Sequence, residues 1–236
     1  TSVVDNTDKV AGYVYACRQM NIPVLPPDVN KSQMGFSVED GAVRFGLSAI
    51  KSLGRPTIEA ILSERAVKEF STMQDFVTRL ISQINKRTVE NLIKSGAFDT
   101  FGYKRKAMMI VHAQLIDDAQ RHSKDSISGQ MSLFDLGDDL KKDFEIKIPN
   151  VGEYTKEELL EYEKEVLGIY ASGHPLDEYA QMWKRHISAM TTDFEIDDET
   201  GETKVRDGAK ETIGGMIMNK TVKTTKNGQL MAFITI

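Results

Sequence analysis

The chain has 236 residues, of which 40% are hydrophobic, so it can bury a core and is not a wholly disordered polypeptide. Its net charge is −5, no apolar run is long enough to cross a membrane, and its first residues lack a signal-peptide pattern. The single Cys17 excludes an internal disulfide, and the four histidines lack the partners and spacing of a metal site. We therefore expect a soluble, cytoplasmic chain that begins mid-protein, and a zinc or thiol enzyme is disfavoured.

Charge is distributed unevenly along the chain. Residues 44–124 carry 14 Lys and Arg against 8 Asp and Glu, whereas residues 125–200 carry 7 against 19. The basic block is suited to face phosphates, while DNA would repel the acidic block. The alternative is that these charges lie on solvated helix faces and have no nucleic-acid partner.

The first 45 residues predict one helix followed by extended chain. Residues 8–20 have the apolar spacing of an amphipathic helix. Ile22–Asp28 contains three prolines and must be extended, because proline fixes φ and restricts the residue before it. A short β-hairpin is expected around Glu39–Ala42.

A helical hairpin is predicted next, at the start of a module spanning residues 46–120. A short helix at Leu47–Lys51 leads into the turn Ser52–Gly54. Pro56 then opens a second helix that ends near Arg65, since proline is well placed in a first turn.

A second helical hairpin is predicted within the same module. Residues 73–80 are helical, residues 81–84 turn, and Asn85 caps a helix that ends at Gly96. The two hairpins together form a tandem helix-hairpin-helix pattern.

Helical periodicity continues from Lys104 to Ala119 and then stops. Residues 121–150 are rich in Ser, Gly, Asp and Lys, so we expect a flexible tether there. A helical connector is expected at 151–210, with helices near 157–167 and 176–186.

The last residues, 211–236, predict a β-hairpin. Thr212–Lys220 and Leu230–Ile236 flank Asn227-Gly228, a strong turn signal. Two strands alone are marginally stable, so this last domain is expected to continue beyond residue 236. The fold class expected for the whole chain is mainly α with β pieces (α+β).

The two helical hairpins carry residues suited to hold phosphates. A helix N-terminus presents unpaired N–H groups that bind phosphate without reading a base, and Gly54 has no Cβ to hold a DNA backbone away. Basic residues in a helix first turn oppose the helix dipole, so an external anion explains them better than folding does. The expected DNA-binding residues are Lys51, Ser52, Leu53, Gly54, Arg55, Asn85, Lys86, Arg87, Lys104 and Arg105. The alternative is an ordinary pair of helical hairpins with solvated lysines.

A second candidate site lies in the expected tether and has the form of a linear docking peptide. Its residues are Gln130, Met131, Ser132, Leu133 and Phe134. In such a peptide the amide of Gln130 sets the register while Leu133 and Phe134 enter a pocket. The alternative is a local hydrophobic tuck.

Taken together, segments running in order along nearly the whole chain resemble the DNA polymerase III alpha subunits, the C-family of bacterial replicative polymerases. The segments are Val24–Asn30, Arg44–Lys51, Leu92–Asp99, Gln130–Phe134 and Leu167–Leu176. The chain departs from the usual hairpin consensus at Ser52, where glycine is common.

The resemblance implies a function and a domain order. It implies a segment that binds duplex DNA and the sliding clamp (beta subunit), positions the polymerase on primer-template for processive synthesis, contacts other replicase subunits through the parent chain and binds no membrane. The implied parts are the end of a fingers domain (1–45), a tandem helix-hairpin-helix module (46–120), a tether with a clamp-binding motif (121–150), a helical connector (151–210) and the first strands of an OB-fold (211–236).

The resemblance also implies that the catalytic carboxylates, which hold Mg²⁺ in the parent polymerase, lie upstream of this chain. We therefore expect no catalytic residue, metal ligand or cofactor here, and a chain that is inactive as a polymerase by itself. Asp117-Asp118, Asp138-Asp139 and Asp197-Asp198 are interpreted as solvated charge.

Three alternatives remain open. The chain could belong to a translesion C-family paralogue, to a protein-interaction scaffold whose helical hairpins never touch DNA, or to a repair nuclease or glycosylase with a helix-hairpin-helix. The missing catalytic constellation disfavours the nuclease. Salt-dependent binding to duplex DNA would distinguish a DNA-binding module from a scaffold.

Overall fold

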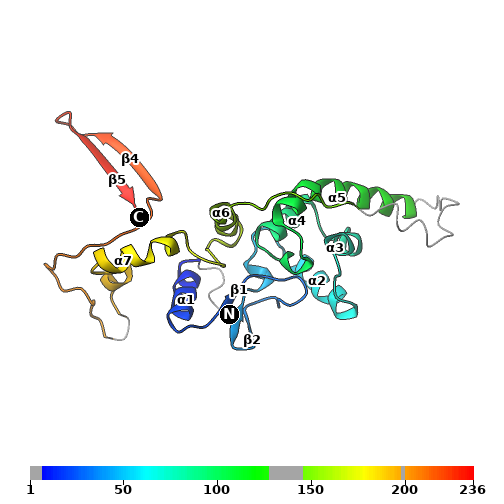
Figure 1. Ribbon diagram of the computed structural model, residues 1–236, viewed down its shortest axis with the longest axis horizontal. Coiled ribbons are helices and arrows are strands. Elements are labelled where there is room, and N and C mark those ends of the chain that lie inside the picture. The colour runs from blue at the N-terminus through cyan, green and yellow to red at the C-terminus, as the bar shows by residue number, and fades with distance from the viewer. Residues whose placement is uncertain (1–6, 128–145, 198–199) are drawn as a thin grey trace. The chain divides into compact units, whose positions relative to one another are not determined.

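The computed structural model describes residues 7–127, 146–197 and 200–236 (Figure 1). The chain divides into two compact units, residues 1–174 and 175–236. Seven α-helices and five short strands are found in the described residues, which confirms the expected α+β class.

A small three-stranded sheet follows the first helix. The elements are α1 (Thr7–Gln19), β1 (Val24–Leu25), β2 (Ser37–Glu39) and β3 (Ala42–Arg44). Strand β3 is central: it pairs antiparallel with β2 and parallel with β1. Asp40 and Gly41 have φ of 49° and 80°, the left-handed pair typical of a two-residue hairpin turn. The predicted hairpin is confirmed, and the proline-rich segment adds a parallel strand that the sequence did not predict.

Both predicted helical hairpins are present. The elements are the 3₁₀-helix η1 (Leu47–Ala49) and the helices α2 (Arg55–Val67), α3 (Met73–Leu80) and α4 (Lys86–Lys94). Asn85 caps α4, since its side-chain oxygen accepts a hydrogen bond from Thr88 N (2.9 Å). Gly96 follows with φ of 82°, so the predicted cap and stop are both confirmed.

Helix α4 lies at the centre of the core of the first unit. Val89, Leu92 and Ile93 are fully buried, and the helix packs against both α5 (Arg105–Ile127) and α6 (Lys156–Leu167). Burying each such aliphatic side chain is worth roughly 1.5–3 kcal/mol. The hairpin turns are therefore held by a well-packed helix.

Helix α5 differs from the prediction at its C-terminal end. It continues past Ala119 to Ile127, into the segment that the sequence predicted as a tether. The apolar spacing disappears there, but residues 120–127 contain neither glycine nor proline, so nothing in the backbone ends the helix.

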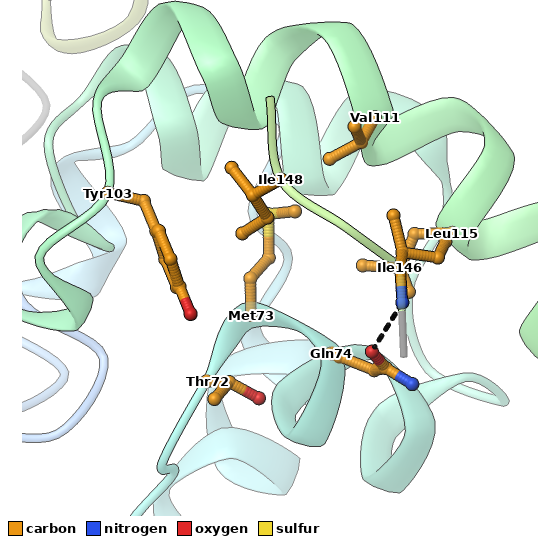
Figure 2. A pocket seen from close by; sticks show the side chains of 8 residues that line it. All are labelled: Thr72, Met73, Gln74, Tyr103, Val111, Leu115, Ile146 and Ile148. Carbon is orange, nitrogen blue, oxygen red and sulfur yellow. Dashed lines mark hydrogen bonds between the residues drawn. The ribbon is translucent and has the colours of Figure 1, made fainter. Parts of the chain in front are cut away.

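Residues 146–150, at the C-terminal end of the predicted tether, pack on the first unit. Ile146 and Ile148 lie against α3 and α5 beside Met73, Val111 and Leu115 (Figure 2). The Ile146 N–H donates to the Gln74 side-chain oxygen (3.3 Å). Residues 121–127 and 146–150 are thus parts of the first compact unit, in contrast to the tether predicted for them.

The expected helical connector (residues 151–210) is divided between the two units. Helix α6 belongs to the first unit, whereas α7 (Ala180–His186) belongs to the second. The helix predicted to begin near residue 157 is nevertheless confirmed, because Thr155 and Glu158 form a capping box and α6 begins at Lys156.

The second unit ends in the predicted β-hairpin. Its elements are η4 (Pro175–Tyr179), α7, η5 (Thr191–Phe194), β4 (Asn219–Thr224) and β5 (Leu230–Thr235). Thr225 N donates to the Gln229 carbonyl (2.7 Å), and Gly228 has φ of 75°. The first strand begins at Asn219 rather than Thr212, because the Thr212 carbonyl accepts from Ser188 N (2.9 Å) and so pairs with chain near α7.

Candidate nucleic-acid interface

The first hairpin turn leaves the start of α2 open. Ser52 has φ of 66°, a left-handed conformation that glycine adopts more readily, which explains why glycine is usual at this position. Gly54 is the N-cap of α2, and no side chain caps it. A Cβ at Gly54 would meet only Pro56 Cδ, at 3.7 Å. Nothing in the described chain requires glycine at position 54 for packing.

The second hairpin turn carries exposed cations at the start of α4. The Arg87 side chain is exposed and makes no hydrogen bond or ion pair with any residue that the structure describes. Lys86 is also exposed, but its ammonium group lies 2.7 Å from the Asp117 carboxylate of α5. Arg55, in the first turn of α2, is similarly paired with Glu59 at 2.8 Å.

Two hydrogen bonds hold the hairpin turns together. The Thr57 hydroxyl, in the first turn of α2, donates to the Gln83 carbonyl in the second hairpin turn (3.1 Å). The Asn91 side-chain amide, on α4, donates to the Lys51 carbonyl in the first turn (2.7 Å). The starts of α2 and α4 are therefore neighbours. Neither link was predicted, although the position of Asn91 on the apolar face of the predicted helix was a signal for one of them, since a buried polar side chain needs a hydrogen-bond partner.

Lys51 and Leu53 hold the first turn on the module. The Lys51 ammonium group donates to the Glu165 carbonyl (2.7 Å), and its backbone N–H donates to the Val166 carbonyl (2.8 Å). These carbonyls belong to the last turn of α6, where a lysine satisfies groups that lack helical partners. Leu53 is buried in the core.

Arg105 corrects one expectation from the sequence. Its side chain is only 8% exposed and is paired with Asp99 (2.7 Å) and Glu163 (3.3 Å). Burial by itself would lower the pKa of Arg105, but the hydrogen bonds and charges of the two carboxylates outweigh burial and raise it. The Arg105 side chain is held in the interior by these carboxylates and is not available to a DNA phosphate.

The basic residues at the start of α5 are also explained by contacts within the chain. The Glu153 carboxylate accepts hydrogen bonds from the backbone N–H groups of Arg105 (2.8 Å) and Lys106 (3.1 Å). Lys104 remains exposed but donates to the Val151 carbonyl (3.0 Å). The anion that this helix start favours is therefore supplied by the chain itself, not by an external phosphate.

The remaining candidate residues fall into two groups. The pentapeptide Gln130–Phe134 and Asp138-Asp139 lie outside the described residues. Asp117 and Asp118 are not simply solvated, since they pair with Lys86 and Arg121. In the described part of the chain, no group of three or more His, Cys, Asp or Glu side chains is placed to hold a metal ion.

No helix among the described residues combines the length and apolar character needed to cross a membrane.

The part of the chain that contains the two linked turns matches a known structural motif. Residues 21–108 match the family model described as the helix-hairpin-helix motif. The match covers both hairpins and the sheet that precedes them.

Comparison with curated proteins extends the similarity to the whole chain. The chain is 36% identical to DNA polymerase III subunit alpha of Vibrio cholerae over 239 aligned residues, covering 100% of this chain and 20% of the relative. It is 34% identical to the subunit of Mycobacterium tuberculosis (strain H37Rv; 97% and 19% covered) and 38% identical to that of Campylobacter jejuni (86% and 17% covered). Along its whole length the chain is therefore a homologue of DNA polymerase III subunit alpha, and it spans about a fifth of the length of these relatives. The resemblance inferred from the sequence is confirmed.

Proposed function

We propose that the two helical hairpins bind duplex DNA through its phosphates. The observation that carries this proposal is the pair of hydrogen bonds, Thr57 to Gln83 and Asn91 to Lys51, that makes the starts of α2 and α4 neighbours. Two adjacent helix N-termini offer N–H groups and partial positive charge to the sugar-phosphate backbone without reading bases.

The residues of this interface have different roles in the proposal. Gly54 lets the DNA backbone approach the uncapped start of α2, while Arg55, Lys86 and Arg87 contact phosphates. Lys51, Ser52, Leu53 and Asn85 hold the two turns in shape, and Lys104 contributes positive charge at the start of α5. Arg105 is left out because it is buried.

The test is a titration of fluorescent duplexes of different sequence at several salt concentrations. Replacing both Lys86 and Arg87 with alanine should weaken all duplexes alike and reduce the slope of log K against log salt by up to about 2, since each lost phosphate contact removes about 0.9. A variant that binds with the parent's affinity and slope would contradict the proposal. A scaffold that never touches DNA would show no salt-dependent binding in any variant.

We further propose that Gln130–Phe134 docks on the sliding clamp. With the hairpins on the duplex, the chain would help to position a polymerase on primer-template for processive synthesis in the bacterial cytoplasm. The support is the form of the peptide and the homology to DNA polymerase III subunit alpha. A translesion paralogue is the alternative within the same family.

The activity of a whole polymerase is likewise a proposal for this chain, because the chain spans about a fifth of its relatives. Polymerisation with Mg²⁺ and contacts with other replicase subunits would belong to the parent protein. The described residues offer no cluster of metal-ligating side chains, so we assign no metal-dependent step to them.

A further inference from the structure

Both helix starts of the proposed interface carry a cation that already has a carboxylate partner. Arg55 pairs with Glu59 at 2.8 Å, and Lys86 pairs with Asp117 at 2.7 Å. The side chains are 78% and 54% exposed in the first pair and 50% and 48% exposed in the second. Ion pairs this exposed contribute little to stability, so they exchange readily with competing ions. A DNA phosphate would have to displace these carboxylates.

The Lys86–Asp117 pair differs from Arg55–Glu59 in origin. Glu59 follows Arg55 by four residues on one helix, a spacing that brings side chains together in any helix. Asp117 instead lies 31 residues from Lys86 and reaches it because α5 packs against α4. The tertiary structure therefore places a negative charge directly on a proposed phosphate contact.

Helix α5 runs beside the second hairpin turn near this pair. Gln120 and Ser123 of α5 line a shallow groove together with Ile81 and Ser82 of the turn. Asp117 precedes Gln120 by one helical turn. A duplex backbone lying along the second turn would thus pass close to the Asp117 carboxylate as well as to Lys86 and Arg87.

We propose that Asp117 limits the affinity of the module for duplex DNA by competing with phosphate for Lys86, an inference that rests on the proposed DNA-binding function. When the duplex binds, Lys86 leaves Asp117, and the freed carboxylate remains as a negative charge beside the phosphates. Both effects weaken the contact and reduce the net number of counterions released. Arg87 stays available, so binding is moderated and not abolished.

The experiment compares duplex affinity over a range of salt for the parent, Asp117→Asn, Lys86→Met and the double variant. Asp117→Asn should bind duplex about two- to fivefold tighter at low salt, the range that an exposed ion pair can supply. Its slope of log K against log salt should steepen by up to about 0.9, one phosphate contact. In the Lys86→Met background the same substitution should produce only the small gain expected from removing one negative charge, because the cation it competes for is gone.

Glu157→Gln provides the matched control. Glu157 is exposed in the first turn of α6, so this variant makes the same change of net charge away from Lys86. The inference is overturned if the parent binds duplex with a normal salt dependence but Asp117→Asn tightens binding no more than Glu157→Gln does. It is also overturned if the gain is the same with Lys86 or with Met at position 86. A parent chain that does not bind duplex at all would instead overturn the proposed function, and this inference with it.

Discussion

Glu163 connects three parts of the first unit through one buried carboxylate. Its side chain is fully buried and accepts hydrogen bonds from the Arg105 guanidinium (3.3 Å) and from the backbone N–H groups of Ala171 (3.1 Å) and Ser172 (2.9 Å). The Ser172 hydroxyl adds a fourth donor (3.0 Å). A buried charge is tolerated only when it is paired and hydrogen-bonded in this way.

Replacing Glu163 with alanine should therefore destabilise the protein strongly. The substitution leaves Arg105 with Asp99 as its one carboxylate partner among the described residues and leaves buried N–H groups without an acceptor. We therefore expect a loss of about 3 kcal/mol in the free energy of unfolding. Urea denaturation followed by circular dichroism measures it. Glu161→Ala, at an exposed position on the same helix, should change the free energy by less than about 0.5 kcal/mol. Equal effects at both positions would refute the structural role of Glu163.

Gly96 and Gly102 provide a second matched pair of positions. Both have positive φ, 82° and 77°, so alanine is strained at either position by about 1 kcal/mol. A Cβ at Gly96 would in addition collide with the Arg105 guanidinium, whereas a Cβ at Gly102 meets nothing within 4 Å. We expect Gly96→Ala to cost about 3 kcal/mol and Gly102→Ala about 1 kcal/mol in the same unfolding assay. Equal stability of the two variants would contradict the inference that Arg105 crowds Gly96.

At the scale of elements, the extended segment at residues 146–150 acts as a packed part of the helical module. Ile146 and Ile148 are half-buried against α3 and α5 (Figure 2). Lys147, which lies between them in the sequence, is exposed. This alternation is that of an extended chain with one face on a core.

Alanine substitutions can test that packing. Replacing both Ile146 and Ile148 should lower the free energy of unfolding by about 2–3 kcal/mol, since each half-buried side chain loses part of its apolar contact. Lys147→Ala should have little effect, and thermal unfolding of the three proteins compares them directly. A double variant as stable as Lys147→Ala would show that the segment does not pack on the module in solution.

At the scale of the whole molecule, the first compact unit contains residues on both sides of the proposed docking peptide. Ile127 and Ile146, the described residues on either side of the segment that contains the peptide, both belong to this unit. The intervening residues can reach at most about 60 Å from end to end when fully extended. A peptide attached at both ends to the proposed DNA-binding unit would keep a high effective concentration near a clamp threaded on the same duplex.

Clamp binding can be separated from duplex binding in one variant. Replacing Leu133 and Phe134 with alanine should remove most of the affinity for the sliding clamp, because these two side chains supply the apolar contact of the peptide. Titration with purified clamp measures this loss. Duplex affinity, measured in parallel, should stay within about twofold of the parent. Unchanged clamp binding, or an equal loss of duplex binding, would contradict the docking role.

Several features of the fold followed from the sequence because they depend on residues close together in the chain. Asn85 caps α4 through Thr88, three residues away, and Gly96 adopts the positive φ that ends a helix. Asp40 and Gly41 form the turn of the N-terminal hairpin. Such short-range interactions are encoded by residue type and spacing, and they suffice to predict the two helical hairpins.

Other features were decided only by the tertiary structure. In the sequence, Arg105 looks like its neighbours Lys104 and Lys106, yet it alone is buried, because packing brings it beside Glu163, 58 residues away. Packing likewise brings Asp117 to Lys86, across 31 residues. Whether a charge faces DNA, a carboxylate or the core depends on which helix packs beside it. That partner can be distant in the chain, so local spacing and composition do not specify it.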